Sequence, residues 1–566
     1  MVGTARRHWA FTVAPLAVGA LLLSACGGGA GQGGGSNVQV REMTGNDINP
    51  QPADQLKDGG NLNLPLVQWP QQWNYNQVQG VGVDLALVSR ALIPEVFLSE
   101  ADGTVRPNPD VLTEWKLLST EPQVIQFTIN PKARWSDGTP ITYQDFVATW
   151  KARNGTDTAY QPASTAGWQD VSSVERGADD RDVRITFAKV YAEWQGLLQF
   201  LYPASHYATP EQFNEDWVGQ LPVTAGPFKV KSMDNTAKVL VLERDPNWWG
   251  EKPKLDTITF KTVPASAQPQ AFQAGDIDAV DIGPDVATFQ TIQQVPNAVI
   301  RKALAPDWRV LNFSARPGTP LADVAVRTAL FKGIDRTALG KAVLGPIVPD
   351  VRPLNNHIFV EGQKGYQDNG APYDFDPQQA QAELDAAGWK LAEGNPIRAK
   401  DGTPLRITLT IPSGIPTSSN EAQIFQQQLK NIGVDLQIST VDLNAWQTQY
   451  LQTGNFELLN MAWEGTPFPI SSVTSIYTFD PGNVNQNYGR IPDTTGINEL
   501  FRQANEELDE AKRIELANKI DQAAWQEGFS LPLYQRPDAW GVRKDLANYG
   551  AFGFAEVDFT KVGFTR

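Results

Sequence analysis

The chain contains a single cysteine, Cys26, among its 566 residues. An intramolecular disulfide is therefore impossible, and cysteine-ligated zinc sites, iron–sulfur clusters and thiol catalysis are excluded with it. With 41% hydrophobic and 19% charged residues, the composition is that of an ordinary globular protein that is large enough for several domains.

Cys26 also ends a secretory signal pattern. Arg6 and Arg7 precede a mostly apolar run over residues 9–23, which is shorter than the ~20 residues of a membrane-spanning helix. Small residues lead directly into Cys26, and this resembles the lipobox of bacterial lipoproteins, whose cysteine receives a diacylglycerol after the preceding peptide is removed. We expect a signal peptide at 1–25, lipid on Cys26, and a mature protein anchored at the extracytoplasmic face of the cell membrane. A spanning anchor is the alternative.

Charge and residue content narrow the possible functions. The net charge of −16 opposes binding to nucleic acid or to anionic lipid. Only His206 and His357 remain once the signal is removed, and the sequence has no zinc-protease, serine-hydrolase or phosphate-loop motif. The sequence therefore predicts a protein that is not an enzyme and that holds no metal or cofactor.

Local patterns predict a mixture of strands and helices. A glycine-rich tether after Cys26 should extend over 26–57, and alternating residues then predict strands at 62–66, 124–129 and 183–187. Thr142 and Asp145 form a capping-box pattern, while Asp323 and the Asp376-Pro377 pair mark the starts of two further helices.

The region from 407 to 463 reads as a βαβαβ unit. Strands are expected at 407–411, 434–438 and 456–463, with helices between them, and such units build a parallel sheet. Ligands of open α/β sheets gather at the carboxyl ends of the strands. Those ends are residues 412–419 and 463–466.

Collinear motifs give the chain a family resemblance. It resembles the extracellular solute-binding proteins of family 5, the peptide- and nickel-binding proteins of ABC importers, and in particular the actinobacterial oligopeptide-binding lipoproteins. The matching segments are 59–60, 135–145, 225–228, 242–249, 275–278, 326–336, 373–377, 388–389 and 531–534.

The resemblance implies an α/β, two-lobed periplasmic-binding-protein-like fold of type II, cluster C, with an extra domain on the first lobe. Lobe I would comprise 58–93, 222–305 and 535–566, the extra domain 94–221, and lobe II 306–534. A monomer of this kind would trap an oligopeptide between lobes that close by hinge motion and pass it to ABC permease subunits.

The resemblance also directs attention to Trp463, Glu464, Gly465 and Thr466. Peptide binders of the family carry a tryptophan here, with an aspartate three positions later that pairs with the peptide ammonium. This chain has Thr466 at that position, and a hydroxyl cannot replace a buried charge pair. Glu464 is a candidate replacement, although one residue after Trp463 on a strand it would point to the opposite face.

Five other residues are weaker candidates for ligand contact, and three of them have an ordinary structural alternative. Trp69 could wall the cleft or pack in the core, Trp308 lies where the lobes should join, and Tyr488 could line the cleft. His357 could donate to a ligand carboxylate, but a surface histidine is the better interpretation. Ser413 lies in a loop before a helix N-terminus that could hold an anion or could merely cap the helix.

Alternatives to peptide import remain open. The threonine at position 466 leaves room for a blocked or modified peptide, or for a ligand that is not a peptide. The same scaffold could also serve cell-envelope assembly as a non-transport lipoprotein. An enzyme acting on envelope peptides is disfavoured by the scarcity of histidine and cysteine.

Overall fold

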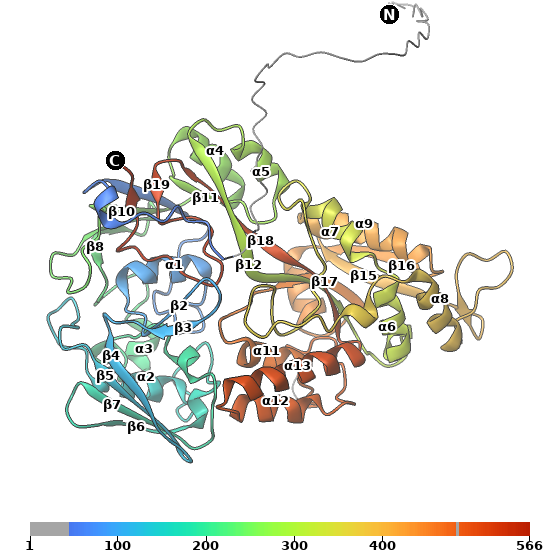
Figure 1. Ribbon diagram of the computed structural model, residues 1–566, viewed down its shortest axis with the longest axis horizontal. Helices are drawn as coiled ribbons and strands as arrows, with labels where there is room; N and C mark the ends of the chain where they lie inside the picture. The colour runs from blue at the N-terminus through green and yellow to red at the C-terminus, as the bar shows by residue number, and fades with distance from the viewer. Residues whose placement is uncertain (1–42, 44, 483–485) are drawn as a thin grey trace, which may run out of the picture. The chain divides into compact units, whose positions relative to one another are not determined.

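The computed structural model describes residues 43, 45–482 and 486–566 (Figure 1). The expectations for the signal peptide, for Cys26 and for the first part of the tether fall outside these residues. Within them, three sheets of four or more strands, three small two-stranded sheets and flanking helices make up the fold, so the predicted mixed α/β class is confirmed. None of the helices described is long and apolar enough to cross a membrane.

Lobe I is built on a four-stranded sheet of order β1-β10-β9-β8. Its strands are β1 (Asn61–Leu66), β8 (Phe228–Asp234), β9 (Val239–Arg244) and β10 (Thr257–Thr262). In β1 the alternation of the sequence places Leu62, Leu64 and Leu66 in the core of the lobe. Helix α1 (Val83–Leu92) packs into the same core, and α4 (Gln268–Ala274) and α5 (Val286–Ile292) flank β11 (Ala279–Asp281).

Residues 47–57 differ from the flexible tether expected there. Asp47 pairs with Ala551 and Leu56 pairs with Thr565 through isolated bridges, and Leu56 is fully buried. The Asn548 side chain adds bonds to the backbone of Gln51. The polar composition suggested a tether, but side-chain amides and one apolar anchor tie this segment to the C-terminal residues.

The extra domain has its own core around a sheet of order β4-β5-β7-β6. These strands are β4 (Leu112–Thr120), β5 (Gln123–Ile129), β6 (Val171–Arg176) and β7 (Asp182–Phe187), and a hairpin of β2 (Phe97–Ser99) and β3 (Val105–Pro107) precedes them. Helices α2 (Tyr143–Arg153) and α3 (Pro210–Glu215) complete it. The predicted capping box of Thr142 and Asp145 is confirmed at the start of α2.

Lobe II contains most of a six-stranded sheet of order β11-β18-β12-β17-β15-β16. Strands β15 (Arg406–Pro412), β16 (Asp435–Val441) and β17 (Leu458–Trp463) run parallel, as the βαβαβ pattern predicts. The first crossover is α9 (Pro416–Lys430), whereas the second is a short helix, α10 (Leu443–Ala445), continued by a π-helical turn (Trp446–Leu451).

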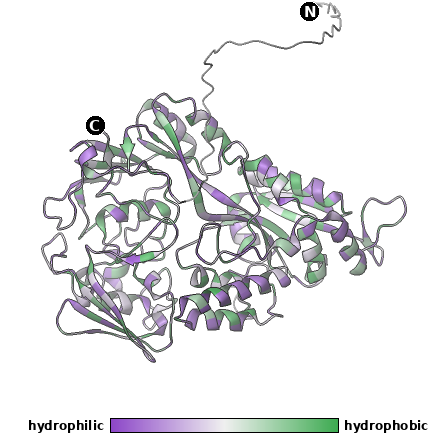
Figure 2. Cartoon of the chain, viewed as in Figure 1, coloured by the Kyte–Doolittle hydropathy of each residue, from purple (hydrophilic) through white to green (hydrophobic). Residues whose placement is uncertain are grey.

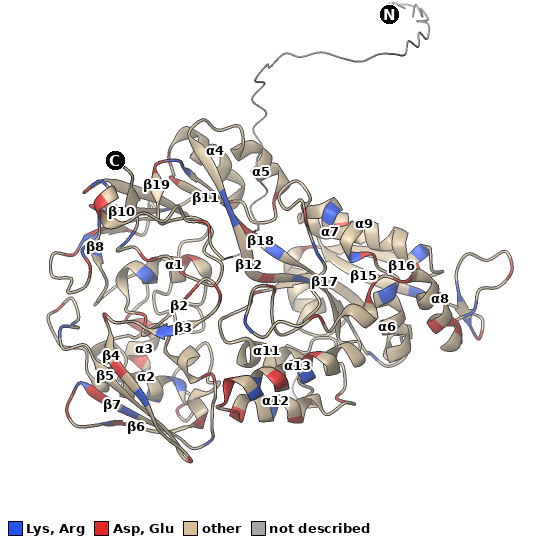
Figure 3. Ribbon diagram, in the orientation of Figure 1, with Lys and Arg blue, Asp and Glu red and all other residues tan. Residues whose placement is uncertain are grey.

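The remaining helices of lobe II cover this sheet and extend beside it. They are α6 (Val324–Lys332), α7 (Arg336–Leu344), α8 (Pro377–Ala386), α11 (Pro469–Tyr477), α12 (Ile497–Glu506) and α13 (Glu510–Gln526). Asp323 and Asp376 cap α6 and α8 as predicted. Figures 2 and 3 show hydrophilic and charged residues along α12 and α13. The buried apolar residues of both helices recur at helical spacing and join one hydrophobic core.

Two long strands connect the lobes. β12 (Ala298–Phe313) and β18 (Ser530–Arg543) pair antiparallel along their length, next to β11 at one end, while β12 pairs with β17 at the other (Figure 1). Their register shifts between Leu304 and Trp308 and again between Arg309 and Val310. Such irregularities bend a strand locally. The bend lies in the middle of β12, just before the segment that pairs with β17.

Candidate ligand-binding site

The carboxyl end of β17 lies beside the bend of β12. Trp463, the last residue of β17, is the direct partner of Trp308 on β12. The ring of Trp463 stacks on Tyr488, with centroids 6.3 Å apart and planes 5° from parallel. The indole nitrogens of Trp308 and Trp463 are both shielded from solvent, and among the described residues neither donates to a protein acceptor. Two of the predicted aromatic candidates are thus adjacent to Trp463.

A buried ion pair holds the strands beneath these rings. The Arg309 guanidinium donates to both carboxylate oxygens of Glu421 on α9, at 2.7 to 3.0 Å. Asn460 of β17 and the Tyr534 hydroxyl of β18 donate to the same carboxylate, at 2.7 and 2.5 Å. Glu421 is completely buried, and four donors from three strands satisfy it. This network fixes β12, β17, β18 and α9 relative to one another.

The three residues after Trp463 have separate surroundings. Gly465 lies so close to β12 that a Cβ would be 2.5 Å from the Pro306 carbonyl oxygen, so only glycine fits there. The Thr466 hydroxyl accepts from the Phe468 N–H at 3.1 Å and lies 3.2 Å from the Phe468 carbonyl oxygen. It is therefore engaged in a local turn. Glu464 is exposed.

The charge of Glu464 acts on groups of both lobes. It helps to raise the pKa of Tyr75 and of Glu556, for both of which burial is the main cause. It also contributes to the raised pKa of Arg90 on α1. Asp307 lies at the bend of β12, and burial raises its pKa to about 6. The charge of Arg536 acts to lower this pKa, and the charge of Glu464 acts to raise it. Glu464 is thus near enough to lobe I and to the crossing strands for its charge to act on their titratable groups.

Further carboxylates share this region. Burial raises the pKa of Asp538 on β18 to about 7 and raises that of Asp281 at the end of β11. Asp281 is nonetheless exposed, and Glu556 keeps 48% of its side chain accessible. Water thus reaches these two carboxylates, although the surrounding protein disfavours their charge. We call Glu464, Asp307, Asp281, Asp538 and Glu556 the interlobe acidic group.

Two arginines partly neutralise this group. Arg90 contacts Glu556 at 2.5 Å and Glu95 at 3.6 Å, and Arg536 contacts Asp307 at 3.3 Å. Burial raises the pKa of Glu95 to about 7. Acids therefore outnumber the bases that pair with them, so the region favours a cation over an anion. No sequence motif marked Asp307, Asp538, Glu556 or Arg90, which meet only through the fold.

The structure places three predicted ligand contacts elsewhere. Trp69 lies in the core of lobe I, edge-on to Trp73, and donates to Asn235 at 3.0 Å. Ser413 is exposed at the end of β15, where its backbone N–H bonds to the Val441 carbonyl. The N-cap position of the following helix α9 is Ile415, which makes no side-chain cap, so Ser413 does not cap the helix.

His357 is neither a surface residue nor accessible to a ligand. Its Nδ1 lies 2.7 Å from Asp521, its Nε2 lies 2.9 Å from the Ser530 carbonyl oxygen, and the residue is 1% exposed. The Asn-Asn-His sequence suggested a loop, but Asn356 caps the following amides and Asp521 on α13 draws the ring inside. Both ring nitrogens are used within the protein.

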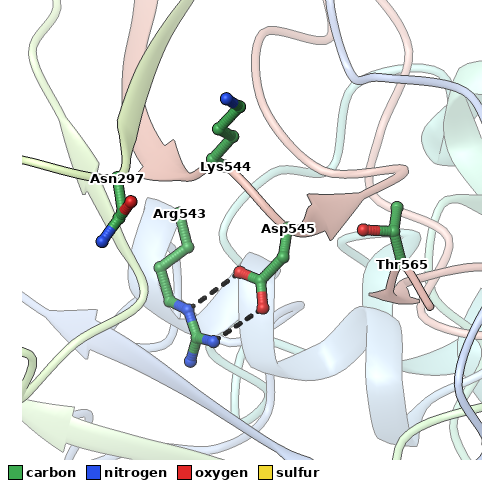
Figure 4. A pocket seen from close by; sticks show the side chains of 5 residues that line it. All are labelled: Asn297, Arg543, Lys544, Asp545 and Thr565. Carbon is green, nitrogen blue, oxygen red and sulfur yellow. Dashed lines mark hydrogen bonds and ion pairs between the residues drawn. The ribbon is translucent and has the colours of Figure 1, made fainter.

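A cavity of about 530 Å³ lies apart from these residues (Figure 4). Asn297, Arg543, Lys544, Asp545 and Thr565 line it. Arg543 pairs within it with both oxygens of Asp545, at 3.1 and 2.8 Å, and with Asp278 at 3.0 Å. None of the predicted ligand-binding residues lines this cavity. Among the described residues no cluster of His, Cys, Asp and Glu could hold a metal ion.

Comparisons with known proteins agree with the fold. Residues 106–485 match the family model described as bacterial extracellular solute-binding proteins, family 5 Middle. The oligopeptide-binding protein OppA of Mycobacterium tuberculosis is 39% identical over 569 aligned residues, covering 100% of this chain and 95% of the relative.

Two solved structures have the same fold. The periplasmic EDTA-binding protein EppA superposes with a TM-score of 0.83 at 24% identity, covering 94% of this chain and 100% of the other. The Bacillus subtilis oligopeptide-binding protein AppA, in complex with a nonapeptide, gives a TM-score of 0.72 at 20% identity, covering 90% and 100%.

Proposed function

The chain belongs to family 5 of the bacterial extracellular solute-binding proteins, and we propose that it captures oligopeptides between its lobes for an ABC importer. The family model identifies the same family that the sequence motifs resemble. The name of its mycobacterial relative supports oligopeptides as the ligand class.

The interlobe acidic group is the observation that carries the proposal. A peptide entering the region would bring an N-terminal ammonium, the type of charge that an excess of carboxylates attracts. Thr466 is engaged with Phe468, so Glu464 is the proposed anchor for this ammonium. Its exposure and its interaction with Arg90 and Glu556 of lobe I support that role.

Aromatic residues would form the wall of the site. Trp463 and Tyr488 present a stacked pair next to Glu464, and Trp308 lies on the facing strand. In the proposed site the indole N–H groups of both tryptophans would donate to ligand carbonyls, since neither has a protein acceptor among the described residues. Extended peptides bind such sites largely through their main chain, so one site accepts many sequences.

We place the protein at the outer face of the cell membrane as a monomer. Residues 1–25 would be removed, Cys26 would carry the lipid, and the closed protein would hand its ligand to permease subunits. The proposal involves no enzymatic step, because ligand capture and release need only the movement of the lobes.

Native mass spectrometry of the purified protein, followed by denaturing release and sequencing of what it carries, tests the proposal. Co-purified peptides with free amines are the expected result. A protein that carries nothing and gains no thermal stability from peptide mixtures would contradict the proposal and favour a role in envelope assembly.

The local turn at Thr466 favours a second candidate. A chain without the usual aspartate could bind an amine-blocked or modified peptide, or a ligand that is not a peptide. In that case the same release experiment would yield N-terminally blocked peptides or a non-peptide molecule, and replacing Glu464 would leave its affinity unchanged.

A further inference from the structure

The extra domain reaches lobe II through one carboxylate. Glu193 precedes a short 3-10 turn (Trp194–Leu198) of the extra domain, and its side chain crosses to the start of α11. It accepts hydrogen bonds from the Ser471 N–H at 2.8 Å, the Ser471 hydroxyl at 2.6 Å and the Ile470 N–H at 3.3 Å. Glu193 is 7% exposed, so these bonds replace most of its contact with water.

Two further contacts surround this carboxylate. The Ala192 N–H donates to the Asn505 carbonyl of α12 at 2.8 Å. Gly196 lies against the Phe468 ring, and a Cβ at position 196 would be 2.8 Å from that ring. Residues 192–196 therefore form a small, closely packed interface with lobe II, where α11 and α12 lie beside the extra domain (Figure 1).

The lobe II side of this interface is continuous with the proposed ligand site. Residues 463–471, which we call the anchor segment, run from Trp463 through Glu464 and Thr466 to Ser471. The Thr466 hydroxyl bonds to the Phe468 backbone, and Phe468 packs on Gly196. The threonine thus shapes the turn that contacts the extra domain.

The first amides of α11 have no cap from their own helix. Phe468 stands at the N-cap position without a side-chain hydrogen bond, and Pro469 follows it. Glu193 supplies the missing acceptors from another domain, and its negative charge lies at the positive end of the helix. Separation of the domains would leave these amides uncapped, so closure and order of the anchor segment depend on each other.

We propose that Glu193 is a positioning residue that latches the extra domain to the anchor segment and so favours the closed arrangement of the ligand-free protein. Its consequence for ligand capture rests on the proposed function: the latch holds Glu464 and Trp463 in place before a ligand arrives. The latch itself is a property of the empty protein and can be tested without any ligand.

Distance measurements between spin labels on the full chain provide the test. Cys26 is the only cysteine, so Cys26→Ser allows two labels to be placed uniquely, by Lys151→Cys on α2 and Lys512→Cys on α13. Glu193→Gln keeps the shape of the side chain but removes its charge. We expect the population with separated labels to rise roughly tenfold, as for loss of one charge-assisted hydrogen bond.

A second variant and a control separate the latch from general damage. Gly196→Ala should also separate the labels, because its methyl group would push Phe468 away without altering any charge. Glu175→Gln makes the same chemical change at an exposed site of the extra domain and should leave the distances unchanged. Hydrogen exchange at Ile470 and Ser471 should accelerate only in the first two variants.

Unchanged distances in both Glu193→Gln and Gly196→Ala, with wild-type unfolding temperatures, would overturn the latch. That outcome would leave the proposed function intact, because no ligand enters the measurement. Conversely, a protein that binds no peptide but opens on Glu193→Gln would keep the latch and lose the proposed function.

Discussion

Two sets of charges lie beside β12 and are opposite in character: the Glu421 carboxylate paired with Arg309, and the interlobe acidic group around Asp307, two residues before Arg309. Glu421 beside Arg309 is completely buried and has four donors, while Asp307 and its neighbours share too few bases and remain partly open to water. The first group is satisfied within the protein. The second is satisfied only in part: Asp538 accepts bonds from Trp540, Phe552 and Gly553, and arginines reach Asp307 and Glu556, whereas Glu464 is exposed. This difference separates structural charge from charge suited to binding.

Replacement of Glu421 should have the largest effect on stability, because it removes the satisfied member of this comparison. Glu421→Ala should leave Arg309 buried without a counter-ion, and breaking a buried pair from one side costs about 3–5 kcal/mol. Thermal or urea unfolding measures this loss. The double variant Arg309→Met with Glu421→Leu removes both charges and should be the more stable of the two. Equal stability of the single variant and the wild type would show that the pair is not satisfied as described.

The pH dependence of stability should come in large part from Asp307 and Asp538 of the second group and from Glu95 beside Arg90. The pKa values of Asp307, Glu95 and Asp538 are raised to about 6, 7 and 7, so the folded protein binds more protons than the unfolded chain between about pH 4 and 7. Stability is therefore fully present below about pH 4 and is lost as the pH rises through 6 to 7. The unfolding temperature of the ligand-free protein should be higher at pH 5 than at pH 8; the reverse order would contradict the raised values.

Ligand affinity should depend on pH in the opposite direction to stability and increase as the pH rises. A bound cation favours ionised carboxylates, so binding of a free-amine peptide should release protons and strengthen as the pH rises from 5 to 7. Calorimetry in buffers of different ionisation enthalpy counts these protons. Affinity that is flat over this range would place the ligand's charge away from the interlobe acidic group.

The smallest effect is expected at Thr466. Thr466→Ala removes one local hydrogen bond to Phe468, a loss of about 1 kcal/mol in the free energy of unfolding. Peptide affinity should change less than about threefold, because the hydroxyl is not directed to a ligand. A large loss of affinity with unchanged stability would make Thr466 a direct ligand contact.

Much of the fold could be predicted from local signals. The parallel strands of lobe II, the caps at Asp323 and Asp376 and the capping box at Thr142 all follow from spacing and residue type. Residues 47–57 could not be predicted to pack, because their partners lie about 500 positions away in the chain. Local composition does not report such long-range pairs.

The site was predictable in part. The end of β17 is where α/β sheets bind ligands, and the stacking of Trp463 on Tyr488 involves two of the residues proposed from sequence. For Trp69 the structure shows the core alternative, and His357 is buried instead of lying at the surface, because a polar or aromatic residue beside turn signals does not by itself reveal its burial. No sequence motif marks Glu193, Asp307 or Glu556, since the contacts that give them a role are made only after distant segments of the chain come together in the fold.

The central claim is that the interlobe acidic group holds a ligand's positive charge through Glu464. Titration calorimetry with one peptide in two forms, free-amine and N-acetylated, tests it most directly, using Glu464→Gln and, as a control for lost surface charge, Glu211→Gln. We predict that Glu464→Gln weakens the affinity for the free-amine peptide about tenfold and leaves the affinity for the acetylated peptide unchanged, while Glu211→Gln changes neither affinity. Equal affinity of the wild type for the two forms, with no effect of Glu464→Gln, would contradict the account.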